Sequence, residues 1–211
     1  MPDLREAYDS GASSTDNITY GTAYGPNLYY DANLYFDGTA EANAGIELFR
    51  AGSVSLGTAT ANGSGNWSIY SSVLAEGIHS ITAKQTDVAG NISPASGALS
   101  VTVDKSAPGA PSTAPDLDSA SDTGSSSADD ITDDTTPTFN GTGVEANATI
   151  TIYIGESSVG SGLADGSGNW SVTTAALAYM VHNISAKATD VAGSISSASP
   201  ELSVTITSTP P

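Results

Sequence analysis

The sequence has no cysteine and only two histidines among its 211 residues. Without cysteine there can be no disulfide, thiolate metal site or cysteine nucleophile, and two histidines are too few for most zinc or triad chemistry. Basic residues are also scarce, because 5 Lys and Arg stand against 23 Asp and Glu, for a net charge of −18. Nucleic acids and anionic membrane surfaces are held by clustered Lys and Arg. We therefore expect neither as a partner.

Long hydrophobic runs are missing as well. No apolar run approaches the roughly 20 residues that a membrane helix needs, and residues 1–3 do not begin a signal or transit peptide. We therefore expect a soluble chain without membrane insertion. The hydrophobic content of 38% still suffices for modest cores, and the length fits one large or two ordinary domains.

The chain repeats itself. Residues 61–104 align with residues 164–207 at a constant offset of 103, with 26 identities in 44 positions by direct count. Residues 2–19 match residues 115–132 at an offset of 113. The change of offset places an insertion of about ten residues in the first repeat, near residues 20–29. The sequence therefore predicts two homologous domains.

Apolar residues alternate with polar ones in segments such as 150–154 and 99–103, which is the period of half-buried strands, and helical periodicity is absent. At about 100 residues per repeat, this pattern predicts an all-β fold of two tandem sandwich domains with about seven strands each. We expect domains at 1–107 and 115–211, joined by a semi-rigid proline-rich linker at 108–114.

The two tryptophans and the two histidines recur at matching positions in the repeats. Trp67 and Trp170 each enter a strand after a Gly-Asn turn, so we interpret them as core anchors, with a sugar-stacking platform as the alternative. His79 and His182 share a strand face with isoleucines, which favours a structural role at the margin of the core over a ligand or base.

Several motifs occur in a fixed order across both repeats. They are Ser121-Asp122-Thr123-Gly124, Asp129-Asp130-Ile131-Thr132, Gly141-Thr142, Gly168-Asn169-Trp170 and Thr86-Asp87-Val88-Ala89-Gly90-Asn91. As a set, they resemble the bacterial immunoglobulin-like repeats of giant, type I-secreted, calcium-dependent (RTX-type) adhesins. The resemblance implies immunoglobulin-like sandwiches on an extracellular, cell-surface or biofilm protein. It also implies a monomer whose partners are neighbouring repeats of the same chain, stiffened by Ca²⁺.

A bias in the placement of aspartate indicates calcium independently of that resemblance. Eight of the sixteen aspartates lie between positions 104 and 134, with Lys105 as the one cation among them. Ca²⁺ takes six to eight oxygen ligands, and an Asp-, Gly- and Ser-rich stretch supplies them on a backbone that can bend. The alternative is that these aspartates are solvated loop residues, because no dense EF-hand spacing occurs.

Strand order divides the candidate ligands into groups. The first group is expected at the junction between the domains: Asp104, Asp116, Asp118 and Asp190, with Asp87 as the counterpart of Asp190 in the first domain. The second group would clamp the long loop after the first strand: Asp122, Asp129 and Asp130, with Asp9 and Asp16 as first-domain counterparts.

Three functions stay open. The first is a calcium-stiffened extender that projects a ligand-binding region away from the cell. The second is a glycan- or peptide-binding module that uses the Tyr-rich insertion, with Tyr24, Tyr29 and Tyr30 as candidates, although these rings could instead pack against the domain. The third is an accessory domain of a secreted hydrolase. We expect no enzyme within the chain, because acidic pairs such as Asp129-Asp130 lack the opposed environments that separate an acid from a base.

Overall fold

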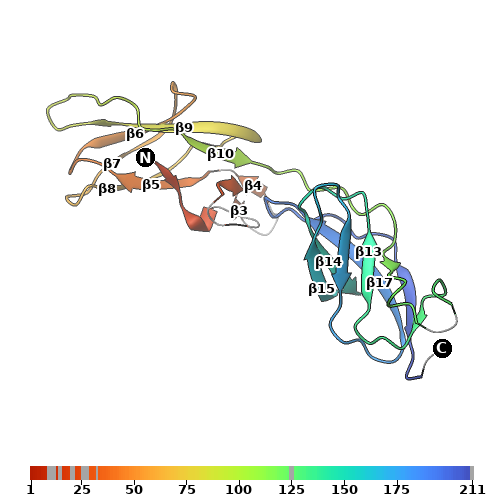
Figure 1. Cartoon of the computed structure of the whole chain (residues 1–211). Helices are drawn as coiled ribbons and strands as arrows, with labels where there is room; N and C mark the ends of the chain where they lie inside the picture. Colours follow the sequence, from red (N-terminus) through yellow and green to blue (C-terminus); the bar gives the residue numbers. More distant parts are fainter. Residues whose placement is uncertain are drawn as a thin grey trace. The chain divides into compact units, whose positions relative to one another are not determined.

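The structure is a computed structural model that describes residues 1–8, 13, 16–19, 22–24, 29–31, 33–123 and 126–209. The chain divides into two compact units, a first domain, Met1–Ser106, and a second domain, Ala107–Pro211 (Figure 1). Within the described residues, the helical content is the single 3-10 turn η1 (Glu6–Tyr8), and no helix there could span a membrane. The predicted all-β fold of two tandem domains is confirmed.

The first domain is a sandwich of two sheets. The three-stranded sheet has the order β1 (Asp3–Leu4), β5 (Tyr35–Thr39), β8 (Asn66–Tyr70). The five-stranded sheet has the order β2 (Ile18–Thr19), β10 (Leu99–Val103), β9 (Gly77–Thr86), β6 (Gly45–Arg50), β7 (Val54–Thr60). Because β1 pairs with β5 and β2 pairs in parallel with β10, the first strand of the sandwich is divided between the two sheets.

The second domain repeats this topology. Its three-stranded sheet has the order β11 (Asp116–Leu117), β13 (Thr138–Gly141), β16 (Trp170–Thr173). Its five-stranded sheet has the order β12 (Ile131–Thr132), β18 (Leu202–Ile206), β17 (Val181–Thr189), β14 (Thr149–Ile154), β15 (Ser157–Leu163). Each sandwich therefore shows eight strands among the described residues where about seven are predicted, since the divided first strand counts twice.

The insertion predicted near residues 20–29 contains a hairpin of its own. Strands β3 (Thr22–Tyr24) and β4 (Tyr29–Asp31) pair antiparallel as a separate two-stranded sheet. No such hairpin interrupts the described part of the second domain. The extra residues are thus added outside the ladder hydrogen bonds of the two main sheets.

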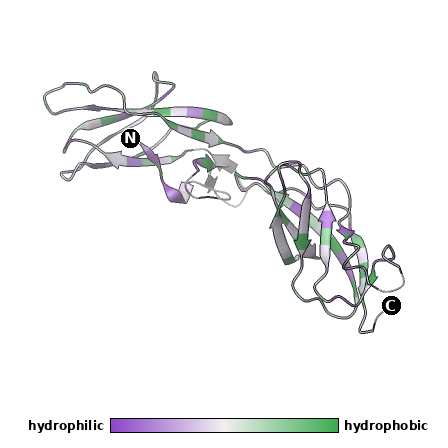
Figure 2. Cartoon of the chain, viewed as in Figure 1, coloured by the Kyte–Doolittle hydropathy of each residue, from purple (hydrophilic) through white to green (hydrophobic). Residues whose placement is uncertain are grey.

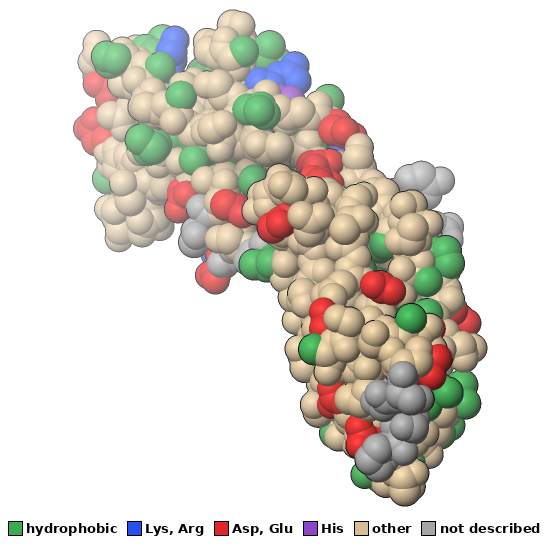
Figure 3. All heavy atoms as spheres, turned by 45° about the vertical axis from the view of Figure 1, so that its right-hand side comes forward, with side chains coloured by type: hydrophobic (Ala, Val, Ile, Leu, Met, Phe, Trp, Pro, Cys, Tyr) green, Lys and Arg blue, Asp and Glu red, His purple; other side chains and the backbone are tan. Residues whose placement is uncertain are grey.

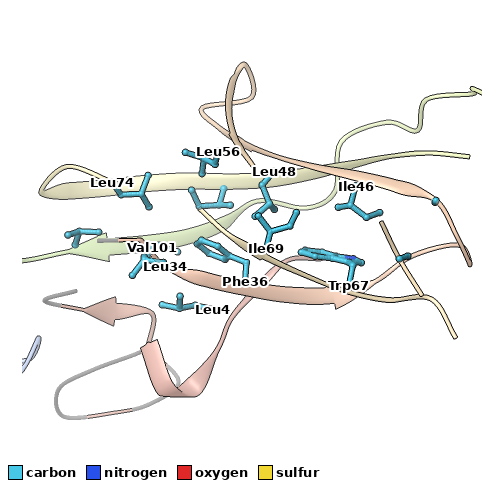
Figure 4. Packing of buried hydrophobic residues seen from close by; sticks show 14 residues of the cluster. Leu4, Leu34, Phe36, Ile46, Leu48, Leu56, Trp67, Ile69, Leu74 and Val101 are labelled. Atoms are coloured by element: carbon cyan, nitrogen blue, oxygen red, sulfur yellow. The ribbon is translucent and has the colours of Figure 1, made fainter. Parts of the chain in front are cut away.

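Hydrophobic and hydrophilic residues alternate along the strands (Figure 2), and the buried hydrophobic ones form one core cluster in each domain. In the first domain, Phe36 and Ile69 of the three-stranded sheet pack in one cluster with Leu48 of the five-stranded sheet (Figure 4). In the second domain, Phe139 and Ile150 belong to the equivalent cluster. Burying such side chains between two sheets is the main favourable term in the folding of each domain.

Both tryptophans and both histidines occupy the predicted places. Trp67 is 6% exposed and Trp170 is 5% exposed, and each belongs to its domain's core cluster. The buried rings of His79 and His182 place Nε2 2.7 Å and 2.8 Å from the carbonyl oxygens of Ala75 and Ala178. These contacts fit a structural role at the margin of the core.

Each tryptophan ring requires a glycine on the neighbouring strand. A Cβ atom on Gly38 would lie 2.6 Å from Cζ2 of Trp67, and a Cβ on Gly141 would collide with the ring of Trp170 in the same way. Because the tryptophan ring covers the strand at this point, only a residue without a side chain fits beneath it.

Gly38→Ala should therefore destabilise the first domain by about 1–3 kcal/mol, the usual cost of overpacking. Its melting temperature should fall by about 4–8 °C for each kcal/mol. The control is Gly63→Ala, because a Cβ there meets nothing within 4 Å. Calorimetry that finds equal melting temperatures for the two variants would contradict this account of the packing.

Candidate functional site

The site is the loop that joins β11 to β12 in the second domain. The carbonyl oxygen of Asp118 accepts hydrogen bonds from the N–H groups of Ser121 (2.8 Å) and Asp122 (2.9 Å), which turns the chain sharply after β11. The Thr123 hydroxyl then donates to Oδ1 of Asp133 (2.6 Å), and the Ser121 hydroxyl donates to Oδ2 of Asp134 (2.9 Å). These two aspartates thus anchor the loop rather than point to a ligand.

Asp122 differs from these anchored aspartates. It is only 5% exposed, and its Oδ2 atom accepts a long hydrogen bond of 3.4 Å from the N–H of Asp130. Its Oδ1 atom is buried and has no hydrogen-bond partner among the residues that the structure describes, which leave out 124 and 125 of this loop. A buried carboxylate oxygen without a donor costs free energy, more so when it is charged.

Asp130 lies beside Asp122 at the end of the loop, where its backbone has a left-handed φ of 57°. Burial raises the pKa of the Asp130 carboxyl group, and the negative charges of Asp122, Asp116 and Asp129 raise that pKa further. We call Asp116, Asp122, Asp129 and Asp130 the Asp122 cluster. Sequence reasoning placed Asp116 with the junction residues, and in the structure its negative charge also acts on Asp130.

The Asp122 cluster has the chemistry that a calcium ion requires. Carboxylate oxygens are the hard ligands that Ca²⁺ prefers. A cation would supply the missing partner of Asp122 Oδ1, and it would offset the repulsion that raises the pKa of Asp130. As the side chains stand, no three acidic or histidine groups of the described residues are already gathered closely enough to hold a metal. Binding would have to draw them together.

Several other predicted ligands accept hydrogen bonds in their own turns. Asp118 accepts from the Ala120 N–H (2.9 Å) and from the Asn140 amide (2.6 Å), and these hydrogen bonds, in that order, lower the pKa of Asp118. Oδ1 of Asp104 accepts from the Ser106 N–H at 3.1 Å.

In each domain, the turn that follows the long strand β9 or β17 begins with an aspartate that accepts hydrogen bonds within that turn. The side-chain amide and the backbone N–H of Asn91 donate to Asp87 at 2.7 and 2.8 Å, and they lower its pKa. In the second domain the Ser194 N–H donates to Oδ1 of Asp190 at 2.8 Å. Both aspartates stabilise the turn that follows a long strand.

The first-domain counterparts of the cluster are only partly described. Oδ1 of Asp16 accepts from the Ile18 N–H at 3.0 Å, matching Asp129 and the Ile131 N–H at 3.3 Å. Asn17 stands where the second domain has Asp130, and Asp9 lies outside the described residues. The side chains of the proposed binding tyrosines also lie outside the described part: Tyr24, Tyr29 and Tyr30.

Sequence reasoning did not find the hydroxyl anchors of the loop. The sequence carries a signal for them, because hydroxyl residues flank Asp122 on both sides and two further aspartates follow β12. Which of the eight neighbouring aspartates meets a donor depends on the path of the loop, which spacing alone does not define.

The family can now be stated. A family model described as the bacterial Ig-like domain matches residues 1–105 and again residues 109–208, so the chain belongs to this family as two tandem copies. No curated protein sequence matches the chain.

Solved structures match the chain at low sequence identity. The fibronectin(III)-like modules of Clostridium thermocellum CbhA are 11% identical, with 98% of this chain and 94% of that chain covered and a TM-score of 0.51. The BSP domain of a biofilm-associated protein is 19% identical (TM-score 0.32), with 92% of this chain covered, and the chain spans 29% of that chain's length. The D0-D1 domain of intimin is 15% identical, with coverages of 90% and 94% and a TM-score of 0.28. At 11% identity the likeness to the CbhA modules concerns the fold alone.

The raised pKa of Asp130 has a measurable consequence in chelator. Its protonated form stabilises the second domain fully below the ordinary carboxyl pKa of 3.8, and this stabilisation is lost as the pH rises through the folded-state pKa. Asp130→Asn mimics the protonated form and suits a left-handed φ. The variant should melt higher than the wild type at pH 7, and the difference should vanish below about pH 3.8.

Asp118→Asn serves as the control of opposite sign. The pKa of Asp118 is lowered, so its carboxylate stabilises the domain above pH 3.8 and the substitution should lower the melting temperature at pH 7. Calorimetry between pH 3 and 7 measures both. A lower melting temperature for Asp130→Asn in chelator at pH 7 would refute the electrostatic description of the cluster.

Proposed function

We propose that the chain is a pair of calcium-binding extender repeats from a bacterial surface adhesin, acting outside the cell to hold a ligand-binding region away from its surface. The observation that carries the proposal is the buried Oδ1 of Asp122, which has no hydrogen-bond partner in the described part of the chain. It lies within a cluster of carboxylates, in one of two tandem bacterial Ig-like domains.

The Asp122 cluster would hold the ion within the second domain. Asp122, Asp129 and Asp130 come from the two ends of one loop, and Asp116 comes from β11. A calcium ion shared among them would tie the loop to the sandwich, and its charge would offset their mutual repulsion. Ca²⁺ suits such a loop better than Mg²⁺, which demands a tighter octahedron and keeps its waters.

An extender also needs a connection that resists bending. The connection between the domains contains Pro108, Pro111 and Pro115, and each proline fixes φ near −65°. We extend the calcium proposal to this junction, with Asp104, Asp116, Asp118 and Asp190 as the candidate ligands. A second ion there would restrict the remaining freedom of the linker.

The acidic composition supports the same function. Figure 3 shows acidic side chains spread over this face of each domain, with few basic ones. A net charge of −18 makes separate molecules of this chain repel one another in solution, and it disfavours anionic partners. An extracellular setting, where calcium is abundant, would supply the counter-ion that such repeats require.

Calcium should raise the melting temperature of the second domain. At free Ca²⁺ about 100 times the dissociation constant, one site adds about 2.7 kcal/mol, and extracellular modules bind at about 10⁻⁴ to 10⁻³ M. Asp122→Ala with Asp129→Ala should abolish the calcium-dependent rise.

The matched control is Asp165→Ala. Asp165 accepts hydrogen bonds from Asn169 and Ser167 in its own turn, so the variant should be less stable yet keep the full calcium increment. Calorimetry in chelator and across millimolar calcium measures all three proteins. A calcium increment that survives the double substitution would remove the Asp122 cluster from the proposal.

The junction is tested by small-angle scattering. Calcium should narrow the distribution of interdomain distances in the wild type. Asp104→Ala with Asp118→Ala should lose that narrowing while the second domain keeps its calcium-dependent melting. If calcium leaves the wild-type distribution unchanged, the stiffening is wrong even where the loop site binds.

A further inference from the structure

Three tyrosines of the first domain form a cluster that extends from η1 onto the outer face of the three-stranded sheet. Tyr8 of η1 stacks on Tyr35 of β5 with ring centroids 5.7 Å apart, and Tyr35 meets Tyr70 of β8 edge-on at 4.4 Å. The hydroxyl of Tyr8 donates to that of Tyr70 at 3.1 Å. Tyr70 is nevertheless 61% exposed, so much of its ring faces solvent, while Tyr8 and Tyr35 are partly buried.

A charged pair borders these rings. The Arg5 guanidinium lies over the Tyr35 ring, with Cζ 4.7 Å from the centroid, and its Nε atom is 3.8 Å from Oδ2 of Asp37. The positive charge is thus matched by one carboxylate, and the guanidinium lies within cation–π distance of an aromatic face.

A groove continues along the same face. It has a volume of about 480 Å³, and its lining includes Arg5, Tyr35, Asp37, Thr39, Asn66 and Ser68. The cross-strand register places Tyr35 opposite Tyr70, Asp37 opposite Ser68 and Thr39 opposite Asn66. From Tyr35 to Thr39 the strand covers about 13 Å at 3.3 Å per residue. Rings therefore stand at one end of the row, and short polar side chains follow, of which Asp37 is charged and pairs with Arg5.

The second domain provides an internal comparison. At the register of Tyr35 and Tyr70 it has Thr138 opposite Thr173, and their hydroxyls hydrogen-bond at 2.8 Å. Asp118 replaces Arg5 at the equivalent position after the first strand. The domain folds around the same core without any of these rings. The fold therefore does not require Tyr35 and Tyr70 on this face, whereas Tyr8 also packs against the core of the first domain.

We propose that this face of the first domain binds a neutral glycan. The C–H face of a sugar ring stacks on an exposed tyrosine, and its hydroxyls take hydrogen bonds from guanidinium, carboxylate, amide and hydroxyl groups. Arg5 and Asp37 compensate each other, and the chain's net charge of −18 disfavours anionic sugars. This inference depends on neither calcium nor the extender function.

A printed array of neutral, sialylated and sulfated oligosaccharides, with a random peptide array beside it, tests the proposal on the full chain. The wild type should bind at least one neutral oligosaccharide. Tyr35→Thr with Tyr70→Thr, which recreates the Thr138 and Thr173 pair of the second domain, should weaken that binding about tenfold or more while the domain stays folded.

Tyr179→Thr is the matched control, because Tyr179 is 63% exposed but belongs to the second domain. It should leave the array signal unchanged, and circular dichroism checks the fold of each variant. The proposal is overturned if the wild type binds no neutral oligosaccharide, if only charged sugars or peptides bind, or if the signal survives the double substitution in a folded protein.

Discussion

Everything distinctive in this protein depends on one constraint, the alternation of inward and outward side chains on two facing sheets. Phe36 and Phe139 are fully buried at equivalent positions, and the strands around them keep the same register in both domains. A shift of one residue would turn each hydrophobic row to solvent, so register is strongly specified. Each outward-facing position of one domain therefore has a structural equivalent in the other. Where the two residues differ, the difference changes the surface of the domain and not its fold.

The same constraint explains why the acidic loop concentrates electrostatic cost at one point. The short strands β11 and β12 fix both ends of the loop, so its carboxylates cannot all move apart. Hydroxyl donors from Ser121 and Thr123 satisfy Asp134 and Asp133, whereas the described residues supply no donor to Asp122 Oδ1, and the neighbouring carboxylates raise the pKa of Asp130. A cation is the simplest species that relieves both the repulsion and the unpartnered oxygen, because it needs no further donor from the protein.

The sequence was sufficient for the architecture and not for the site. Internal repetition and alternation predict two sandwiches, and the equivalent tryptophans predict the core, because these properties are local or periodic. The division of the first strand between two sheets was not predicted, since β1 and β2 have only two residues each and carry no period. The donors that distinguish Asp122 from Asp133 come from the path of the loop. The cluster of Tyr8, Tyr35 and Tyr70 joins residues as many as 62 positions apart, which only the fold can bring together.

The two domains use different chemistry at the edge where the first strand meets the next. In the second domain Asp118 accepts from the Asn140 amide at 2.6 Å, a short charge-assisted hydrogen bond that ties β11 to β13. In the first domain Arg5 faces Asp37 at 3.8 Å, with both side chains about half exposed. An exposed pair at that distance contributes little to stability. The Arg5–Asp37 pair of the first domain therefore stabilises the fold less than the Asp118–Asn140 hydrogen bond of the second domain. The exposed ring of Tyr70 beside that pair does not serve stability either. The proposed ligand, which would stack on the rings and hydrogen-bond to the pair, would account for both departures at once.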